Sequence, residues 1–332
     1  MLTDSPQVTV VICSYDREET LGPALESVAS QQTGGDFVFE IVVVDDASTD
    51  GTCEVVRRAA ENSHLPLRYV REYGRGVAFA RNRGVQEARG DWIAFFDDDQ
   101  IAEGRWLLEL MCAARETRAE IVGGARRLDF SGNASPDLGP LVREVLGEKD
   151  YGSRTHRSNR YTLACTGNML VRRDLFHRIG LFDTDMHSGM EDIDLSRRAF
   201  EAGVGSWYTP RAVVRHLIPP QRLREAYLKW TCLRVGANLS LINYKSWGPA
   251  RMLLPCLLRV VHALTLNPLM TAVARLARKP AMLMDRKCYR WMAVGSARMA
   301  LRLLLPRVFP QGEFFEVLAF RGERHTFDDG GR

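Results

Sequence analysis

The sequence predicts an α/β fold, in which a mostly parallel β-sheet is flanked by helices and followed by a C-terminal helical extension. Over the first hundred residues, short apolar runs alternate with segments of helical periodicity, the pattern of a parallel sheet covered on both faces. Polar clusters follow three of the four apolar runs directly, and the composition shifts after Trp230. With 332 residues, 45% of them hydrophobic, the chain is long enough to bury a sizeable core.

The first two strands have clear ends. Residues 8–13 form an apolar run that stops at Ser14, and residues 20–32 then show helical periodicity. Residues 40–44 form a second apolar run, which ends at Asp45. The segment 48–52 is rich in helix-capping residues and predicts a helix over residues 54–62.

The alternation continues and then loosens. We predict a third strand at 67–70, a helix at 77–88 that Gly90 closes, and a fourth strand at 92–96. Beyond residue 113, the Gly/Ser/Asp-rich segments 132–137 and 147–159 predict loops, whereas 166–180 and 191–202 contain further helical stretches. We place a boundary near residues 236–246.

Polar side chains stand at the carboxyl ends of three predicted strands. They are residues 14–17, the pair Asp45-Asp46 and the triplet 97–99. Ligands of such sheets bind in the crevice beyond the carboxyl ends of the strands. We therefore expect the three clusters to face one crevice.

The triplet 97–99 places three carboxylates directly after a buried strand, where they repel one another unless a cation neutralises them. Asp97 and Asp99 can converge on one hard divalent ion, and their oxygens suit Mg²⁺ or Mn²⁺. An acidic turn in solvent is the alternative. The apolar strand before the triplet favours a metal or phosphate role.

A second acidic cluster, Glu191 and Asp192, begins a predicted helix. Either these acids only interact favourably with the positive N-terminal end of the helix dipole, or one of them is a general base that takes a proton from a hydroxyl. His216 follows a strand-like segment. An isolated histidine is commonly structural or exposed, but imidazole can supplement carboxylates at Mn²⁺.

Several classes of protein are disfavoured. The first strand is followed by Ser-Tyr-Asp-Arg instead of G-x-G-x-x-G, and neither a P-loop nor a G-x-S-x-G elbow is present. Seven scattered cysteines without a C-x-x-C pair indicate reduced thiols in a cytosol-like compartment. The N-terminus shows no signal-peptide pattern.

The C-terminal region is strongly basic. Residues 245–310 contain twelve Lys or Arg and one acid, a net charge of +11, whereas the rest of the chain carries −7 of the total of +4. On a helical wheel Tyr289, Met292, Met299 and Leu303 share one arc with arginines outside it, as in a helix that lies on an anionic membrane. Helices that pack on the catalytic domain are the alternative. Charged residues and prolines within 252–274 disfavour a transmembrane helix, and no nucleic-acid-binding module is present.

Five segments in order between residues 8 and 203, followed by His216, resemble family 2 glycosyltransferases of the GT-A fold, which has a Rossmann-like sheet. The matching segments are VTVVICSYDRE, EIVVVDDASTDGT, GVAFARNRGVQEARGDWIAFFDDDQ, CTGNMLVRRDLFHRIGLFD and GMEDIDLSRRAFEAG. Each segment alone is loose, but the ordered set is specific. One departure is Asp16, because many relatives have asparagine there, and the acid adds negative charge near a diphosphate.

The resemblance implies roles for individual residues. It assigns the nucleotide-sugar site to Ser14, Tyr15, Arg17, Asp45, Asp46, Arg81, Asp97, Asp98, Gly167 and Asn168. Within that set Asp46, with Asp45, reads the base, and Gly167 and Asn168 shape the donor-sugar and acceptor pocket. It places the metal, Mg²⁺ or Mn²⁺, on Asp97, Asp99 and His216. Asp192 matches the general base, beside Glu191.

The implied activity is inverting transfer of a sugar, most readily from a UDP-sugar, to a hydroxyl of a glycan or lipid-linked acceptor in bacterial polysaccharide or surface-glycan synthesis. The corresponding regions are 1–110 for the nucleotide-sugar half, 111–235 for the acceptor and catalytic half, and 236–332 for the basic helical region. We expect a cytoplasmic protein, peripheral on the cytoplasmic face of the membrane through residues 250–310. A nucleotidyltransferase acting on sugar phosphates and a non-catalytic nucleotide-sugar-binding module remain alternatives.

Overall fold

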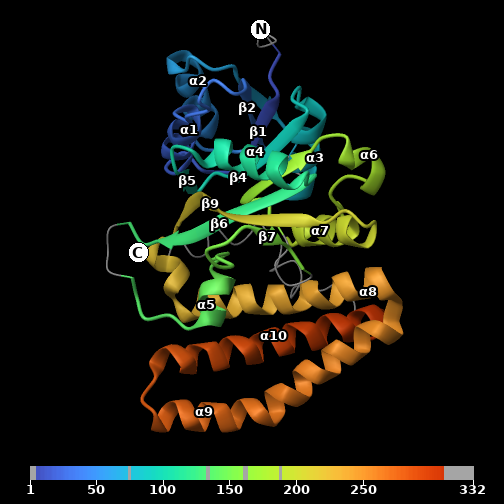
Figure 1. Cartoon of the computed structure of the whole chain (residues 1–332). Helices are drawn as coiled ribbons and strands as arrows, with labels where there is room; N and C mark the ends of the chain where they lie inside the picture. Colours follow the sequence, from blue (N-terminus) through green and yellow to red (C-terminus); the bar gives the residue numbers. More distant parts are fainter. Residues whose placement is uncertain (1–4, 74–75, 132–134, 160–163, 187–188, 310–332) are drawn as a thin grey trace. The chain divides into compact units, whose positions relative to one another are not determined.

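The computed structural model describes residues 5–73, 76–131, 135–159, 164–186 and 189–309. These residues form two compact units (Figure 1). Among the described residues, the sheet unit comprises those within 5–127, 149–186 and 191–217, and the helical unit comprises those within 128–148, 189–190 and 218–309. The boundary expected at 236–246 therefore falls inside a helix. The second unit begins earlier and includes a segment between two strands of the sheet.

The sheet unit contains a single mixed sheet. Its strands are β1 (Val8–Ser14), β2 (Phe39–Asp45), β3 (Leu67–Arg71), β4 (Trp92–Asp97), β5 (Gln100–Ala102), β6 (Ile121–Asp129), β7 (His156–Arg157), β8 (Asn168–Arg172) and β9 (Ser206–Leu217). The order is β3-β2-β1-β4-β8-β6-β9-β5, and β7 pairs with β9. The four strands predicted from the first hundred residues are confirmed as a parallel group, but β8 pairs antiparallel with both β4 and β6. The sheet is therefore less parallel than expected.

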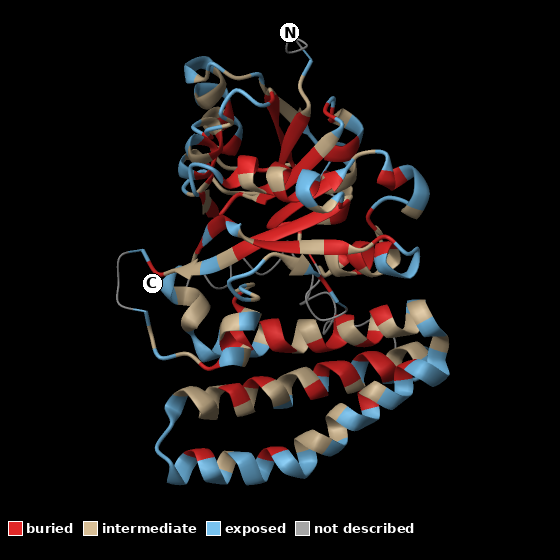
Figure 2. Cartoon of the chain, in the orientation of Figure 1, coloured by how far each residue is buried: buried red, intermediate tan, exposed pale blue. Residues whose placement is uncertain are grey.

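Helices cover both faces of the sheet, as predicted. They are α1 (Leu21–Ala29), α2 (Thr52–Asn62), α3 (Val77–Glu87), α4 (Trp106–Thr117), α6 (Leu175–Ile179) and α7 (Glu191–Glu201). One hydrophobic cluster joins α1, α2 and α4 to one face, and a second joins α3, α6 and α7 to the other. Alternate side chains of β1 divide between them, because Val10 enters the first cluster and Val11 the second. The central strands β1, β2, β4 and β8 are accordingly buried along most of their length (Figure 2), whereas the edge strand β3 is half-buried.

The helical unit consists of α5 (Pro140–Val145), the short 3₁₀ helix η1 (Pro220–Leu223), α8 (Glu225–Leu264), α9 (Leu266–Leu276) and α10 (Pro280–Leu304). Gly248, at φ 75°, interrupts the helical geometry of α8 just before Pro249. The first part of α8 crosses α10 closely, because a Cβ on Gly236 or Gly295 would collide with backbone of the facing helix.

The apolar arc predicted on residues 289–303 is used inside this unit. Met292 packs with the α5–α8 cluster, Leu303 packs beside Met252, and Met299 is buried. That arc therefore does not provide the membrane-facing surface expected from the helical wheel. No single described helix is long and apolar enough to cross a membrane, although the bent pair α8 and α9 passes that test jointly by length and composition. Residues 310–332 of the predicted tail lie outside the described residues.

Candidate functional site

The sheet brings the first polar clusters to one edge. Adjacent parallel strands place Ser14 opposite Asp45 and Cys13 opposite Asp97. Because Cys13 and Ser14 end β1, the acids that end β2 and β4 lie on either side of it. The expectation that three strand ends converge is confirmed.

A second pairing brings His216 to the aspartate triplet. The short strand β5 follows the triplet and pairs antiparallel with β9, placing Gln100 opposite His216. The backbone N–H of Leu217 donates to the carbonyl of Asp99 at 3.0 Å. As a result the His216 Nε2 lies 3.5 Å from Asp99 Oδ2. Two of the three predicted metal ligands are neighbours although they are far apart in the sequence.

Arginines surround the triplet. Arg17 lies 3.6 Å from Asp98 Oδ1 and 3.9 Å from Asp99 Oδ2. Arg126 Nη1 lies 3.7 Å from Asp97 Oδ2. The three acids do not need a bound cation to offset their mutual repulsion, because the guanidinium groups of Arg17 and Arg126 already do so. Repulsion among the three carboxylates is therefore not by itself evidence for a bound metal.

Arg81, on α3, joins the two acidic clusters. Its Nη2 lies 3.4 Å from Asp97 Oδ1, and its Nη1 pairs with Glu191 Oε1. The Glu191 side chain is 2% exposed, whereas that of Asp97 is 32% exposed. One guanidinium thus connects an acid open to a ligand with an enclosed acid beside Asp192.

Asp192 lies in the first turn of α7 and is half-buried. Its Oδ2 accepts hydrogen bonds from the backbone N–H of Thr166 at 3.2 Å and the Thr166 hydroxyl at 3.3 Å, and Oδ1 accepts one from the Ile193 N–H at 2.8 Å. The carboxylate is therefore held in one orientation but is not sealed from solvent. Glu191 differs, because it is enclosed and is paired with Arg81.

The predicted base-reading pair has two different environments. Asp45 is fully buried, and its oxygens accept from Ser48 and from the Tyr69 hydroxyl, the latter at 2.5 Å. These bonds order the turn after β2 and leave Asp45 no face toward a ligand. Asp46 Oδ2 accepts from the Gly76 N–H at 2.9 Å at the start of α3. Asp46 is itself only 4% exposed, and its side chain orders the start of α3.

Asp16, the departure from the family pattern, is anchored by the neighbouring loop. Its backbone has φ 48°, and its Oδ1 accepts from the Thr49 N–H at 2.7 Å. Burial raises the pKa of the Asp16 carboxyl, but hydrogen bonds from Thr49, the Tyr15 side chain and Asp50 outweigh it, so that the pKa lies below the usual value. The added negative charge is thereby stabilised within the loop that follows β1.

Gly167 and Asn168 lie at the start of β8. A Cβ on Gly167 would be 2.6 Å from Asp97 Oδ2 and would overlap Arg126, so only glycine allows these side chains their positions. The Asn168 amide donates to Ala125 and Ala212 carbonyls, both at 2.9 Å, and accepts from the Trp106 indole at 2.7 Å. The Asn168 side chain therefore links β8 to β6 and β9.

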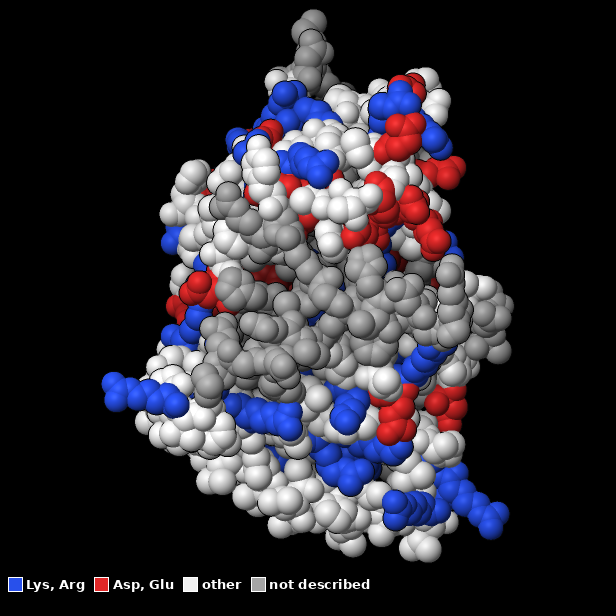
Figure 3. Space-filling model, turned by 180° about the vertical axis from the view of Figure 1, so that it is seen from behind, with Lys and Arg blue, Asp and Glu red and all other residues white. Residues whose placement is uncertain are grey.

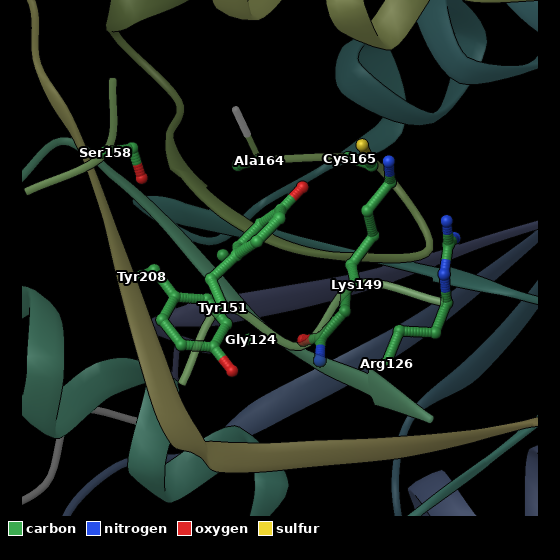
Figure 4. A pocket seen from close by; sticks show the side chains of 10 residues that line it. Gly124, Arg126, Lys149, Tyr151, Ser158, Ala164, Cys165 and Tyr208 are labelled. Carbon is green, nitrogen blue, oxygen red and sulfur yellow. The ribbon is translucent and has the colours of Figure 1, made fainter. Parts of the chain in front are cut away.

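A pocket borders this region (Figure 4). It is lined by Gly123, Gly124, Arg126, Lys149, Tyr151, Ser158, Ala164, Cys165, Asn168 and Tyr208. Arg126 connects the pocket to Asp97, and Cys165 precedes the threonine that holds Asp192. Burial raises the pKa of the Cys165 thiol to about 11, with Asp192 adding to the increase and Lys149 and Arg126 opposing it. The pocket is thus linked to both acidic clusters through its lining residues and carries two cationic side chains.

The residues suit a divalent metal without forming a complete site. Among the residues with described positions, no three His, Cys, Asp or Glu side chains gather closely enough to hold an ion. Asp99 and His216 are paired, and Asp97 has an accessible carboxylate. Mg²⁺ commonly takes one or two carboxylates and completes its shell with substrate phosphates and water. This donor set fits a metal that arrives with a diphosphate.

Sequence reasoning missed several residues of the site. Gln100 and Thr166 adjoin recognised motifs, so their proximity was an available signal. Arg126 lies within a strand that does not alternate cleanly, and Lys149 lies in a segment predicted only as a loop. Nothing in the sequence places these two cations beside Asp97 and Cys165.

Comparison with known proteins identifies relatives among glycosyltransferases. The family model for glycosyl transferase family 2 matches residues 9–180. Glycosyltransferase AglE of Haloferax volcanii is 29% identical over 206 residues, covering 61% of this chain and 64% of the relative. The succinoglycan biosynthesis protein ExoM of Rhizobium meliloti is 26% identical over 240 residues, covering 71% and 75%. Validoxylamine A glucosyltransferase of Streptomyces hygroscopicus subsp. limoneus is 30% identical over 224 residues, covering 60% and 49%.

The chain spans less than two thirds of AglE and about half of the Streptomyces enzyme. Among solved structures, the mannosyltransferase PcManGT from Pyrobaculum calidifontis, in complex with GDP-Man and Mn²⁺, has a TM-score of 0.63 at 21% identity, covering 90% of this chain and 88% of that one. TarS of S. aureus in complex with UDP has a TM-score of 0.50 at 15% identity, covering 90% and 92%. The chain belongs to glycosyl transferase family 2 and has the GT-A fold.

Proposed function

We propose that the chain is an inverting glycosyltransferase that moves a sugar from a nucleotide-sugar donor to a hydroxyl of a glycan or lipid-linked acceptor. The observation that carries the proposal is the link made by Arg81 between Asp97 and Glu191, the neighbour of Asp192. It joins acids suited to donor binding with a carboxylate suited to proton transfer. A site with both functions is what direct sugar transfer requires.

On the donor side, Arg17, Arg81 and Arg126 provide guanidinium groups near the triplet. Guanidinium binds phosphate through paired hydrogen bonds, and fixed positive charge stabilises the charge that grows on a departing diphosphate. Asp46 and Tyr15, at the ends of β2 and β1, are assigned to the nucleoside. The donor is proposed to be a UDP-sugar, with GDP-sugars and dTDP-sugars as the alternatives.

On the acceptor side, Asp192 is proposed to act as the general base. Its carboxylate takes the proton of the acceptor hydroxyl while the acceptor oxygen bonds to the anomeric carbon and the bond to the diphosphate breaks. Thr166 keeps Oδ2 oriented for this transfer. One displacement inverts the anomeric configuration, and no enzyme nucleophile is required. Cys165 is not suited to act as such a nucleophile, because burial raises the pKa of its thiol to about 11 and only the thiolate is nucleophilic.

Asp97, Asp99 and His216 would hold Mg²⁺ or Mn²⁺. When bound, such an ion supplies positive charge to the diphosphate. The Mn²⁺ and GDP-Man in the PcManGT complex support testing this pair of ligands on the present chain.

The full chain should be screened by thermal shift with Mn²⁺ and UDP-glucose, UDP-N-acetylglucosamine, UDP-galactose, GDP-mannose and dTDP-glucose. A donor that binds the folded protein raises the melting temperature. The best donor is then incubated without acceptor. Slow, metal-dependent release of nucleoside diphosphate supports the proposal, whereas pyrophosphate release from a nucleoside triphosphate and sugar phosphate identifies a nucleotidyltransferase. Binding without turnover under any condition identifies a binding module.

A further inference from the structure

The helical unit exposes a large number of aliphatic side chains on two consecutive helices. They lie on the second half of α8 and on α9, and we call them the apolar face: Leu253, Leu254, Leu257, Leu258, Val261, Leu264, Leu266, Leu269, Val273 and Leu276. Leu254, Leu264 and Leu276 are 62%, 73% and 86% exposed. Figure 2 shows this part of the chain as mostly exposed. Contiguous exposed apolar residues of this number mark an interaction surface.

The apolar face is one side of helices whose other side is packed. Met252 and Cys256 of α8 are buried with Ala300 of α10, and Asn267 of α9 is fully buried, donating its amide to the Arg286 carbonyl at 3.0 Å. Arg259 Nη1 donates to the Ser296 hydroxyl at 3.1 Å. A helix that is apolar on all sides suits a membrane span, whereas a helix with one packed side and one exposed apolar side suits an interface.

The surroundings of the apolar face are basic. Arg251, Arg275, Arg278 and Lys279 are exposed beside it. The single acid between residues 245 and 310, Asp285, is buried and accepts the Val142 N–H at 3.0 Å at the start of α5. Figure 3 shows Lys and Arg side chains on the helical part of the molecule beside an uncharged surface. No described acid of the segment therefore offsets its positive charge at the surface.

We propose that the apolar face inserts into the headgroup–acyl boundary of an anionic lipid bilayer, with the flanking cations on the lipid phosphates. Leucines next to arginines match the apolar and anionic layers of such a surface. A second copy of this chain is a poorer occupant, because a symmetric contact would bring the same basic residues against each other. The proposal concerns a surface separate from the sheet unit and does not depend on the proposed reaction.

The test is flotation of the purified full chain with vesicles. Wild-type protein should float with vesicles of 30% phosphatidylserine in phosphatidylcholine and bind less to pure phosphatidylcholine. Leu254→Asn/Leu258→Asn/Leu269→Asn should lower vesicle affinity by at least about 100-fold, because each side chain is removed from an apolar layer. Arg275→Gln/Arg278→Gln/Lys279→Gln should lower affinity for anionic vesicles by about fivefold per charge, an effect that salt should also produce.

The matched control is Leu181→Asn/Phe200→Asn, which changes exposed apolar residues of the sheet unit. It should bind vesicles like the wild type, and melting curves should confirm that all variants are folded. Wild-type protein that stays at the bottom of the gradient overturns the proposal, as does equal loss in the control. A dimer in light scattering that the leucine substitutions dissociate, without vesicle binding, assigns the face to a second copy instead. Resistance of the cell-expressed protein to alkaline carbonate extraction would show a span and would also overturn it.

Discussion

The bridge formed by Arg81 leads to a quantitative prediction about stability. Glu191 is almost completely enclosed, and its carboxylate forms an ion pair with the guanidinium of Arg81. Arg81→Gln leaves this carboxylate buried without its cation, which costs about 3–5 kcal/mol of unfolding free energy. Glu191→Gln should lower the unfolding free energy by less, because Arg81 keeps its ion pair with Asp97, whose Oδ1 lies 3.4 Å away.

The two substitutions should not be additive. The double variant Arg81→Gln/Glu191→Gln removes both charges together, so that its cost should be smaller than the sum by about 2–3 kcal/mol. The free energies are measured by urea unfolding of the full chain, followed by far-UV circular dichroism. The control cycle is Arg57→Gln/Glu61→Gln, an exposed pair on α2 at 2.5 Å, whose coupling should be about 0.5 kcal/mol or less.

Equal costs for the two single variants would contradict the assigned geometry, because they would mean that Asp97 gives Arg81 no support. Additive costs would also contradict it, since groups in direct contact share their interaction energy. Either result would remove the physical link between the two acidic clusters. The proposed function would then rest on family membership alone.

Three further predictions concern single positions. Gly167→Ala should weaken nucleotide-sugar binding about tenfold in titration calorimetry with little loss of stability, because the new methyl group displaces the flexible ends of side chains such as Asp97. Gly295→Val should destabilise the chain by about 1–3 kcal/mol in urea unfolding, because its Cβ meets backbone instead. Asp16 has a lowered folded pKa, so its stabilisation is full above the unfolded pKa near 4 and is lost as pH falls through the folded value. Asp16→Asn should therefore flatten the decline of unfolding free energy between about pH 5 and pH 3, and an unchanged slope would contradict this.

The sequence predicted the parallel half of the fold well because local signals coincide there. Apolar runs, capping residues and strand-ending acids agree within residues 8–97, and β1, β2, β3 and β4 begin within one residue of their expected positions. The antiparallel strands were harder. Their pairing with β4 and β9 depends on contacts between distant segments, for which a single sequence contains no local pattern.

The same distinction applies to the site. The acids at strand ends could be predicted, because topology alone places Asp97 beside β1. The cationic side chains around these acids could not be predicted. Arg126 and Lys149 are far apart in the sequence, and an isolated β-bridge pairs their backbones next to the site. In the helical unit, the sequence shows the amphipathic periodicity of α10. It does not show that the apolar side of α10 packs within the unit while α8 and α9 carry the exposed leucines, because this depends on tertiary packing.

The most direct test of the central claim measures donor binding and sugar transfer together in Asp192→Asn, with Glu201→Gln, an exposed acid of the same helix, as the control. If Asp192 is the base in a site that binds the donor through other residues, the dissociation constant for the nucleotide sugar stays within about threefold while transfer falls by about 10²–10⁴-fold. The control should match the wild type in both. Transfer at the wild-type rate by Asp192→Asn would contradict the account.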